Sequence, residues 1–291
     1  MEENRVLKLG FIGAGKVGTA LATLLNGKGY QVAAVSSRSS SSAENLAKSV
    51  DDCKVYNNNQ VVADAATFIF ITTPDDVIQE VASQVQWHPG QSVIHCSGAA
   101  STDILEHARE AGAMVGSLHP LQTFAGVQQA IENIPGSTFA AEAEKPLLGI
   151  LEELVTALDG QFIELQASDK VAYHAAAVIA CNYLVTLVKM STDLWQTFSV
   201  PKEQAVHALL PLIQGTLNNI DKIGIPQCLT GPIARGDTGT IKKHIDALSK
   251  VAPTLLPAYK ELGLQTIPIS IAKGKITESQ AEELEALLKT D

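Results

Sequence analysis

Short apolar runs alternate with amphipathic stretches along the first 165 residues of the chain. Runs typical of buried strands cover residues 8–12, 32–36, 68–72, 92–96, 114–118, 137–141 and 161–165. Helix-like stretches at 75–85, 102–111 and 145–158 lie between several of these runs. Strands that alternate with helices indicate βαβ units, so this part of the chain is expected to form a doubly wound parallel sheet.

The strand pattern largely stops after residue 165. Helices are predicted from residue 169 to about 198 with Ser168 as the cap, after Pro201, at 239–248, and after Thr277. Thr277 and Gln280 have the spacing of a capping box, and a loop rich in Gly, Pro and Thr covers 224–239. We therefore expect an α/β fold of two domains: a Rossmann-type domain at 1–165 and an all-α domain at 166–291.

The first predicted strand runs directly into a glycine-rich hexapeptide, Gly13-Ala14-Gly15-Lys16-Val17-Gly18, and a helix-like stretch follows. In this position the GxGxxG pattern indicates a dinucleotide site, since its glycines permit a tight turn, close approach of a pyrophosphate and close helix packing. Residues 10–16 also resemble the start of a P-loop. That loop needs a hydroxyl side chain where Val17 stands, so a nucleotide triphosphatase is excluded.

The end of the second predicted strand indicates which dinucleotide binds. NAD-specific sites carry a carboxylate there, but this strand continues into Ser37-Arg38-Ser39. The Arg38 guanidinium and the flanking hydroxyls suit a 2′-phosphate, and Lys16 adds a second positive charge, so NADP(H) is favoured over NAD(H). The alternative is a solvated polar turn. Thr72-Thr73-Pro74 follows another strand and is expected to border the same cofactor.

Composition narrows the class of protein further. The net charge of −10 and a pI near 5.2 argue against a nucleic-acid surface, which needs a basic face. Four cysteines without CxxC spacing suggest a reduced compartment with neither disulfides nor a zinc site, and the histidines show no metal-ligand spacing. The first residues lack a signal-peptide pattern, and the apolar stretch 175–188 reads as a buried helix too short to span a bilayer. A cytoplasmic protein without membrane contact is expected.

Several segments resemble a known superfamily. GFIGAGKVGTALA, SSRS, TTPDDVI, HCSGA and SLHPLQTF resemble the Rossmann domains of the 6-phosphogluconate and β-hydroxyacid dehydrogenases. Relatives in that superfamily include ketopantoate reductase, pyrroline-5-carboxylate reductase and prephenate dehydrogenase. The later segments SDKVAYHAAAVIACNYLVTL and LTGPIARGDTGTIKKHIDAL resemble one bacterial branch, in which a Rossmann-like domain precedes a helical domain of unknown function.

The resemblance implies candidate site residues. Lys170 matches the catalytic lysine of the β-hydroxyacid dehydrogenases and ketopantoate reductases, but His174 stands where those enzymes carry Asn. Asn182 matches a further Asn of ketopantoate reductases. His119, in an HP motif, and Ser97 match catalytic residues of prephenate dehydrogenases. The expected proton donor is Lys170, then His119, then His174; the alternatives are a solvated lysine, packed histidines and a Ser97 that only caps a turn.

These observations predict an NADPH-dependent oxidoreductase that reduces a small keto acid or related carbonyl compound, acting as a homodimer through its helical domain. Arg235 is expected to clamp a substrate carboxylate, or alternatively to contact Asp237 in a structural role. The alternative function is a non-catalytic NADP(H)-binding sensor or partner-binding protein, because a Rossmann fold specifies cofactor binding rather than a reaction.

Overall fold

The computed structural model describes residues 7–289. Residues 1–6, where no signal-peptide pattern is expected, and residues 290–291 lie outside the described residues. The chain divides into two compact units, Met1–Cys181 and Asn182–Asp291. The expected domain boundary after residue 165 stays a prediction, although the last strand ends at Glu164.

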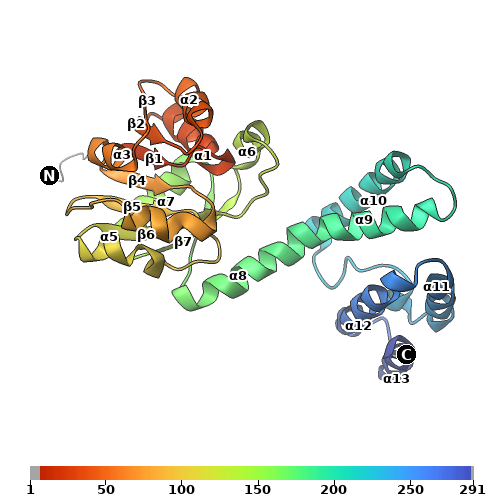
Figure 1. Cartoon of the computed structure of the whole chain (residues 1–291). Coiled ribbons are helices and arrows are strands. Elements are labelled where there is room, and N and C mark those ends of the chain that lie inside the picture. The colour runs from red at the N-terminus through yellow and green to blue at the C-terminus, as the bar shows by residue number, and fades with distance from the viewer. Residues whose placement is uncertain (1–6, 290–291) are drawn as a thin grey trace. The chain divides into compact units, whose positions relative to one another are not determined.

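The first unit is built on an eight-stranded sheet in the order β3-β2-β1-β4-β5-β6-β7-β8 (Figure 1). Its strands are β1 (Lys8–Ile12), β2 (Gln31–Ser36), β3 (Lys54–Tyr56), β4 (Phe68–Ile71), β5 (Ser92–His95), β6 (Met114–Pro120), β7 (Thr138–Ala143) and β8 (Gln161–Glu164). Helices α1 (Lys16–Gly27), α2 (Ser40–Lys48), α3 (Asn59–Ala65), α4 (Ile78–Ser83), α5 (Glu106–Glu110), α6 (Val127–Asn133) and α7 (Leu147–Ala157) connect them, with 3₁₀ turns η1 (Asp75–Val77) and η2 (Thr102–Leu105).

The expected doubly wound sheet is confirmed, with two differences. Strand β3 was not predicted, because it is only three residues long and lacks a buried apolar run. Strand β7 runs antiparallel to β6, whereas all other neighbouring pairs of the sheet are parallel. The chain leaves β6 and re-enters the sheet at the same edge, with Pro120 opposite Phe139, so β7 has to run back along β6.

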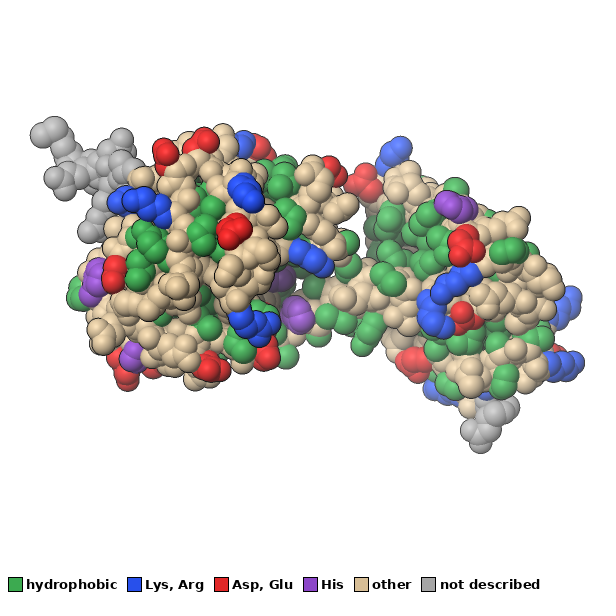
Figure 2. All heavy atoms as spheres, turned by 45° about the horizontal axis from the view of Figure 1, so that its top comes forward, with side chains coloured by type: hydrophobic (Ala, Val, Ile, Leu, Met, Phe, Trp, Pro, Cys, Tyr) green, Lys and Arg blue, Asp and Glu red, His purple; other side chains and the backbone are tan. Residues whose placement is uncertain are grey.

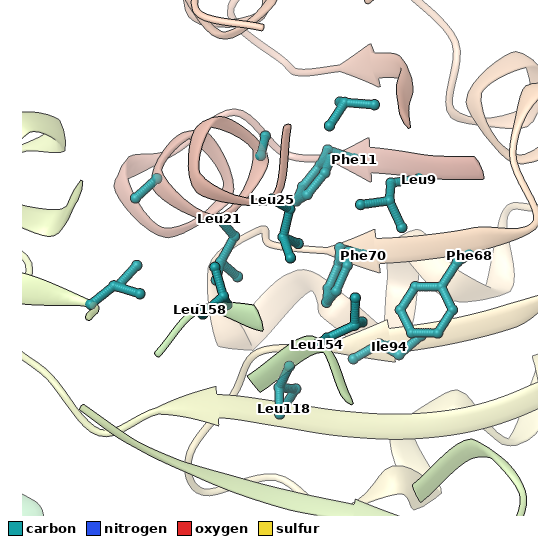
Figure 3. Packing of buried hydrophobic residues seen from close by; sticks show 14 of the residues in the cluster. Leu9, Phe11, Leu21, Leu25, Phe68, Phe70, Ile94, Leu118, Leu154 and Leu158 are labelled. Atoms are coloured by element: carbon teal, nitrogen blue, oxygen red, sulfur yellow. The ribbon is translucent and has the colours of Figure 1, made fainter. Parts of the chain in front are cut away.

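Alternate strand residues bury opposite faces of the sheet. Phe11 and Phe70 lie on one face with their rings stacked 5.1 Å apart, and helices α1 and α7 cover them with leucine side chains (Figure 3). Ile12, Ile69 and Ile71 lie on the other face, packed with residues of α3, α4 and α5. Because both faces are covered, the sheet holds the ends of its strands in fixed positions.

Helices follow the last strand. The 3₁₀ turn η3 (Ala167–Asp169) leads into α8 (Lys170–Ala177) and a π-helical turn, η4 (Val178–Asn182). The predicted cap at Ser168 is wrong, since Gln166 forms the cap instead and shares a capping box with Asp169. The amide side chain of Gln166 reaches the backbone of the first turn, while the Ser168 hydroxyl bonds to the Asp169 carboxylate.

The second unit is all-α, as predicted. It comprises α9 (Tyr183–Gln196), α10 (Lys202–Ile223), η5 (Ile233–Arg235), α11 (Thr238–Val251), η6 (Pro253–Leu255), α12 (Leu256–Ala272) and α13 (Glu278–Lys289). Ile241, Ile267 and Leu284 form the centre of its core. The capping box expected before the last helix is confirmed, since Thr277 and Gln280 exchange backbone-to-side-chain hydrogen bonds.

The stretch expected to be a buried helix is exposed instead. Residues 167–196 are helical, with a mean hydropathy of 1.7 over the most apolar window, and none of that window is buried. By length and composition this helix could cross a membrane, a criterion that helices of soluble proteins also meet. Val171, Ile179 and Val185 are among its exposed apolar side chains, and Figure 2 shows many hydrophobic side chains at the surface of the helical part. Nothing within the described residues packs over them, which is why the expected burial is not seen.

Candidate active site

The glycine-rich loop lies between β1 and α1 and has the geometry of a phosphate cradle. Gly13 has a φ of +111°, and a Cβ there would lie 2.8 Å from the carbonyl carbon of Thr72. A Cβ on Gly18 would collide with the Thr72 side chain and lie 2.7 Å from the Gly13 oxygen. Gly15 has no such neighbour closer than 4.0 Å, so the space above the loop is open. The loop is therefore tight on its protein side and accessible where a ligand would approach.

A buried polar atom without a partner lies beside this loop. The Thr73 hydroxyl has no hydrogen bond within the part of the chain that the structure describes. A Cβ built on Gly13 would lie 2.9 Å from the backbone nitrogen of Thr73, which places Thr73 against the loop. A buried hydroxyl normally finds a partner, so this atom fits a polar group of a bound molecule. The loop and Thr73 together fit a dinucleotide.

The polar turn after β2 is exposed. Arg38 lies at the surface, and among residues 7–289 its guanidinium has no ion pair or hydrogen bond. Ser39 caps α2 by accepting a hydrogen bond from the Ser42 backbone, while Ser37 is half-buried. A free guanidinium beside a helix start can bind an anion from solution. Its role toward a 2′-phosphate stays a prediction.

Lys170 lies in the interior of the first unit. Its side chain is only 3% exposed, and its ammonium donates a hydrogen bond to the Ser117 hydroxyl on β6. The Glu142 carboxylate on β7 lies 3.6 Å from the ammonium nitrogen. That carboxylate also accepts hydrogen bonds from the backbone and the hydroxyl of Thr102. Lys170 is therefore a buried, paired ammonium and not a solvated surface charge.

Two histidines meet over a glycine at the end of β5. His119 Nδ1 lies 2.8 Å from the Tyr173 hydroxyl, and the rings of His119 and His174 are 6.2 Å apart. A Cβ on Gly98 would lie 2.8 Å from His119 Nε2 and 2.9 Å from His174 Cδ2. Only glycine lets both imidazoles approach the backbone this closely. His119, Tyr173 and His174 thus form one cluster beside Gly98.

Ser97 is held in a closed network. Its hydroxyl donates to Asp75 at 2.6 Å and accepts hydrogen bonds from the backbone N–H groups of Ala99 and Ala100. The Ser97 backbone in turn donates to His95 Nδ1 at 3.2 Å. These bonds fix the turn after β5, so the turn-capping alternative for Ser97 is observed; a contact with substrate stays a prediction.

Burial sets the protonation of this region. It lowers the pKa of His119 to about 4, with smaller contributions from the nearby His174 and Lys170. Burial also raises the pKa of Tyr173 to about 12 and that of Cys96 to about 12. The pKa of Lys170 is lowered by burial, against the opposing effect of Glu142. At neutral pH the His119 imidazole is therefore neutral, the Tyr173 phenol keeps its proton, and Cys96 is a thiol without nucleophilic character.

The predicted site residues are distributed over both units. Lys170, His119, His174 and Ser97 all belong to the first unit. Asn182 and Arg235 belong to the second. Asn182 ends the π-helical turn and is exposed. The Arg235 guanidinium lies 3.6 Å from the Asp237 carboxylate, which is the structural contact considered as the alternative.

Three residues that contact the predicted site residues were not predicted themselves: Glu142, Tyr173 and Asp75. Glu142 is a charged residue in an otherwise apolar strand, which was a usable signal. Tyr173 lies one helical turn after Lys170, at a spacing that places both on neighbouring parts of the same helix face. Asp75 shows no comparable signal, because an acidic residue after Pro74 also suits the first turn of a helix.

Comparison with known proteins agrees with this architecture. Residues 2–120 match the family described as a Rossmann-like domain, and residues 137–266 match the family described as Domain of unknown function (DUF2520). No curated protein matches the chain.

Solved structures from several organisms share the fold. A candidate NADP oxidoreductase, BF3122 from Bacteroides fragilis, is 22% identical, with a TM-score of 0.72 over 90% of this chain and 98% of that one. Protein TM1727 from Thermotoga maritima is 25% identical, with a TM-score of 0.71 over 91% of this chain and 99% of that one. A reductive aminase from Aspergillus terreus, in complex with NADPH and ethyl-5-oxohexanoate, is 14% identical, with a TM-score of 0.64 over 98% of this chain and 93% of that one.

The order of the domains agrees with the resemblance seen in the sequence. The Rossmann-like match covers the glycine-rich loop and the strands up to β6. The second match begins at β7 and extends into the helical unit. The chain thus combines, in this order, a match to the Rossmann-like family and a match to the DUF2520 family.

Proposed function

We propose that the protein is an NADPH-dependent reductase of a small keto acid or a related carbonyl compound. The observation that carries this proposal is a buried Lys170 ammonium and a His119–Tyr173 pair within the same unit as an open glycine cradle. Ligands of α/β sheets bind at the carboxyl ends of the strands, and the cradle and Gly98 both follow such ends. The similar NADP oxidoreductase and the NADPH-bound reductive aminase support this choice of cofactor.

The cofactor site consists of three segments. Residues 13–18 would hold the diphosphate through backbone N–H groups at the start of α1, where the cap residue Gly15 provides no side-chain bond. Ser37, Arg38 and Ser39 would hold the 2′-phosphate. Thr72, Thr73 and Pro74 would border the cofactor, with the Thr73 hydroxyl as a hydrogen-bonding group. Bound NADPH would supply a hydride to an electrophilic carbon of the substrate.

Lys170 is the proposed proton donor. A lysine ammonium has three N–H donors, and Ser117 accepts a hydrogen bond from one of them. Glu142 lies 3.6 Å away as an ion-pair partner, so a donor remains for a substrate oxygen. The buried positive charge would stabilise the negative charge that develops on that oxygen. Burial lowers the pKa of Lys170, which makes the ammonium a stronger acid.

His119 would orient the substrate oxygen. The Tyr173 phenol keeps its proton, so it can donate to Nδ1 of His119 and leave the proton of the neutral imidazole on Nε2, the nitrogen closest to Gly98. His174, which approaches the same glycine, is the third candidate. Ser97 would position this turn through Asp75. Roles of Asn182 and Arg235 toward the substrate stay predictions.

A homodimer formed through the helical unit is part of this proposal. Helices α9 and α10 carry exposed apolar side chains, including Val185, Leu212 and Ile223, and Ile225 follows them. Exposed apolar patches on soluble proteins often mark a protein–protein interface. The proposed partner is a second copy of the chain. In a symmetric dimer the same surface of each copy is in contact, so the apolar side chains of α9 and α10 would cover one another.

Cofactor preference tests the binding part of the proposal. Titration of the protein with NADPH and with NADH, followed by nucleotide fluorescence, should show tighter binding of NADPH. Arg38→Asp removes a charge-assisted contact and adds repulsion, so NADPH affinity should fall by about 10- to 100-fold. Lys48→Asp, at the other end of α2, is the matched control. An unchanged preference in Arg38→Asp would remove Arg38 from the site.

Catalysis is tested separately. A panel of keto acids and cyclic imines is incubated with NADPH, and loss of nicotinamide absorbance is followed for the native protein and for Lys170→Met. Oxidation that depends on both substrate and Lys170 supports a reductase. NADPH binding without oxidation of any compound would favour the sensor or partner-binding function.

A further inference from the structure

A buried proton donor needs a route by which its proton is replaced. The Lys170 side chain is 3% exposed, so water has almost no direct access to its ammonium. If Lys170 gives a proton to substrate in each turnover, as proposed above, a neighbouring group must return one. Of its two described partners, the Ser117 hydroxyl is itself fully buried.

The other partner, Glu142, reaches solvent. Its side chain is 13% exposed and lines a cavity of about 380 Å³ beside β6, β7 and β8. Arg109, Glu144, Lys145 and Glu164 also line this cavity. The residues that line it come from neither the glycine-rich loop nor the turn that carries Gly98. The cavity is thus separate from the proposed cofactor and substrate site, and it holds several water molecules by volume.

The geometry points to Glu142 as a proton relay, which carries protons from water in this cavity to the buried Lys170. This relay rests on the role of Lys170 as proton donor in the proposed function. Glu142 is held for that task, because the Thr102 backbone N–H and hydroxyl both donate to its carboxylate, and Arg109 donates to the Thr102 hydroxyl. One carboxylate oxygen therefore faces Lys170 at 3.6 Å while the side chain also borders the cavity.

The proton balance of the relay is simple. When Lys170 protonates the substrate oxygen, an N–H bond breaks, an O–H bond forms, and a neutral amine is left. A cavity water protonates Glu142, the carboxyl O–H bond then breaks as a new N–H bond forms on Lys170, and hydroxide in the cavity is neutralised by bulk solvent. No oxidant or reductant takes part in these steps.

Other charged groups face Lys170 and have to be weighed. Asp75 and Cys96 lie close enough to influence it, and His95 lies close enough to be influenced by it. Asp75 is bonded to the Ser97 hydroxyl, Cys96 keeps its proton, and both nitrogens of His95 are hydrogen-bonded. Glu142 is therefore the ionisable neighbour that combines contact with Lys170 and contact with the cavity.

Side-chain NMR of the whole protein tests the relay without cofactor or substrate. With ¹⁵N-labelled lysine, the exchange rate of the Lys170 ammonium protons with water is measured, and Lys170→Arg identifies the signal. In Glu142→Gln we expect exchange to slow by about tenfold or more, since general-base proton transfer is lost. A purely electrostatic role gives the opposite sign, because removing the negative charge lowers the lysine pKa and speeds loss of its protons.

Matched variants complete the experiment. Glu144→Gln and Glu164→Gln change the same cavity without touching the Lys170 pair, and should leave the exchange rate unchanged. In Glu142→Ala, added formate should restore fast exchange by entering the cavity. Glu142→Asp keeps an acid at the position and should retain part of the rate if Glu142→Gln does not fold.

The outcomes separate this inference from the proposed reductase function. Unchanged or faster exchange in Glu142→Gln, or equal slowing in Glu144→Gln, would overturn the relay even if the protein reduces carbonyl compounds. Slow exchange in Glu142→Gln together with absent NADPH oxidation would establish the proton path and refute the proposed reaction.

Discussion

The buried His95 imidazole should make folding of the first unit sensitive to acid. It is fully buried, with Nδ1 accepting a hydrogen bond from the Ser97 backbone and Nε2 within 3.2 Å of the Ser101 carbonyl oxygen. This arrangement satisfies a neutral ring protonated on Nε2. A second proton on Nδ1 would face the N–H of Ser97, so the charged form loses a hydrogen bond as well as its hydration.

The magnitude follows from the pKa of His95 in the two states. Burial, and next the nearby Lys170, lower the pKa from 6.5 to about 3 in the folded protein. As pH falls below 6.5, the unfolded chain binds a proton that the folded chain does not, so stability is lost down to about pH 3. Between about pH 7.5 and pH 5 this loss amounts to about 2 kcal/mol.

Urea denaturation at a series of pH values measures this loss. Trp87 is buried in the first unit, so its fluorescence reports unfolding there, and Trp195→Phe removes the signal of the second unit. In this background His95→Gln cannot titrate at position 95 and should lose about 2 kcal/mol less than the parent between about pH 7.5 and pH 5. His88→Gln, at an exposed histidine of the same unit, should follow the parent.

The comparison uses the slope of the free energy of unfolding against pH, so an overall loss of stability in His95→Gln does not affect it. Parallel curves for the parent and His95→Gln would refute the reasoning that His95 is buried in its neutral form. A change in slope in His88→Gln as large as that in His95→Gln would assign the effect to general charge.

Three further predictions concern the Lys170–Glu142 pair, Gly98 and the proposed dimer interface. Lys170→Met should destabilise the first unit by about 3 kcal/mol, because Glu142 keeps a partly buried charge without its cation. In urea denaturation, adding Glu142→Gln should restore most of this loss. Equal stability of all three proteins would contradict the prediction. Gly98→Ala places a Cβ 2.8 Å from His119 Nε2, so kcat/KM of the reduction should fall by about 100-fold with NADPH affinity unchanged, whereas unaltered kinetics would separate His119 from the site. Leu212→Glu should convert a dimer into monomers in analytical ultracentrifugation, and a stable dimer in this variant would place the interface elsewhere.

Local patterns were sufficient to predict most of the fold. The strand at residues 8–12 coincides with β1, and the capping box at Thr277 is present, because both depend on residues close in sequence. β3 was missed because it has no apolar run of its own and depends on pairing with β2. The antiparallel direction of β7 depends on where the chain re-enters the sheet, which residue periodicity does not encode.

The site was less predictable, because its contacts join residues far apart in sequence. Glu142 approaches Lys170 only because β7 pairs with β6 in a register that puts Glu142 opposite Ser117. His119 meets Tyr173 across 54 positions of the chain. The exposed face of the helix at 167–196 was misjudged for a related reason: an apolar helix can pack within its own chain or against another molecule, and periodicity does not distinguish the two.

Carbonyl-dependent oxidation of NADPH, measured with and without Lys170, tests the central claim most directly. The account predicts that at least one keto acid or cyclic imine is reduced by the native protein, and that Lys170→Met lowers the rate by about 100-fold or more while NADPH still binds. Reduction at the native rate by Lys170→Met would contradict the proposed role of the buried ammonium.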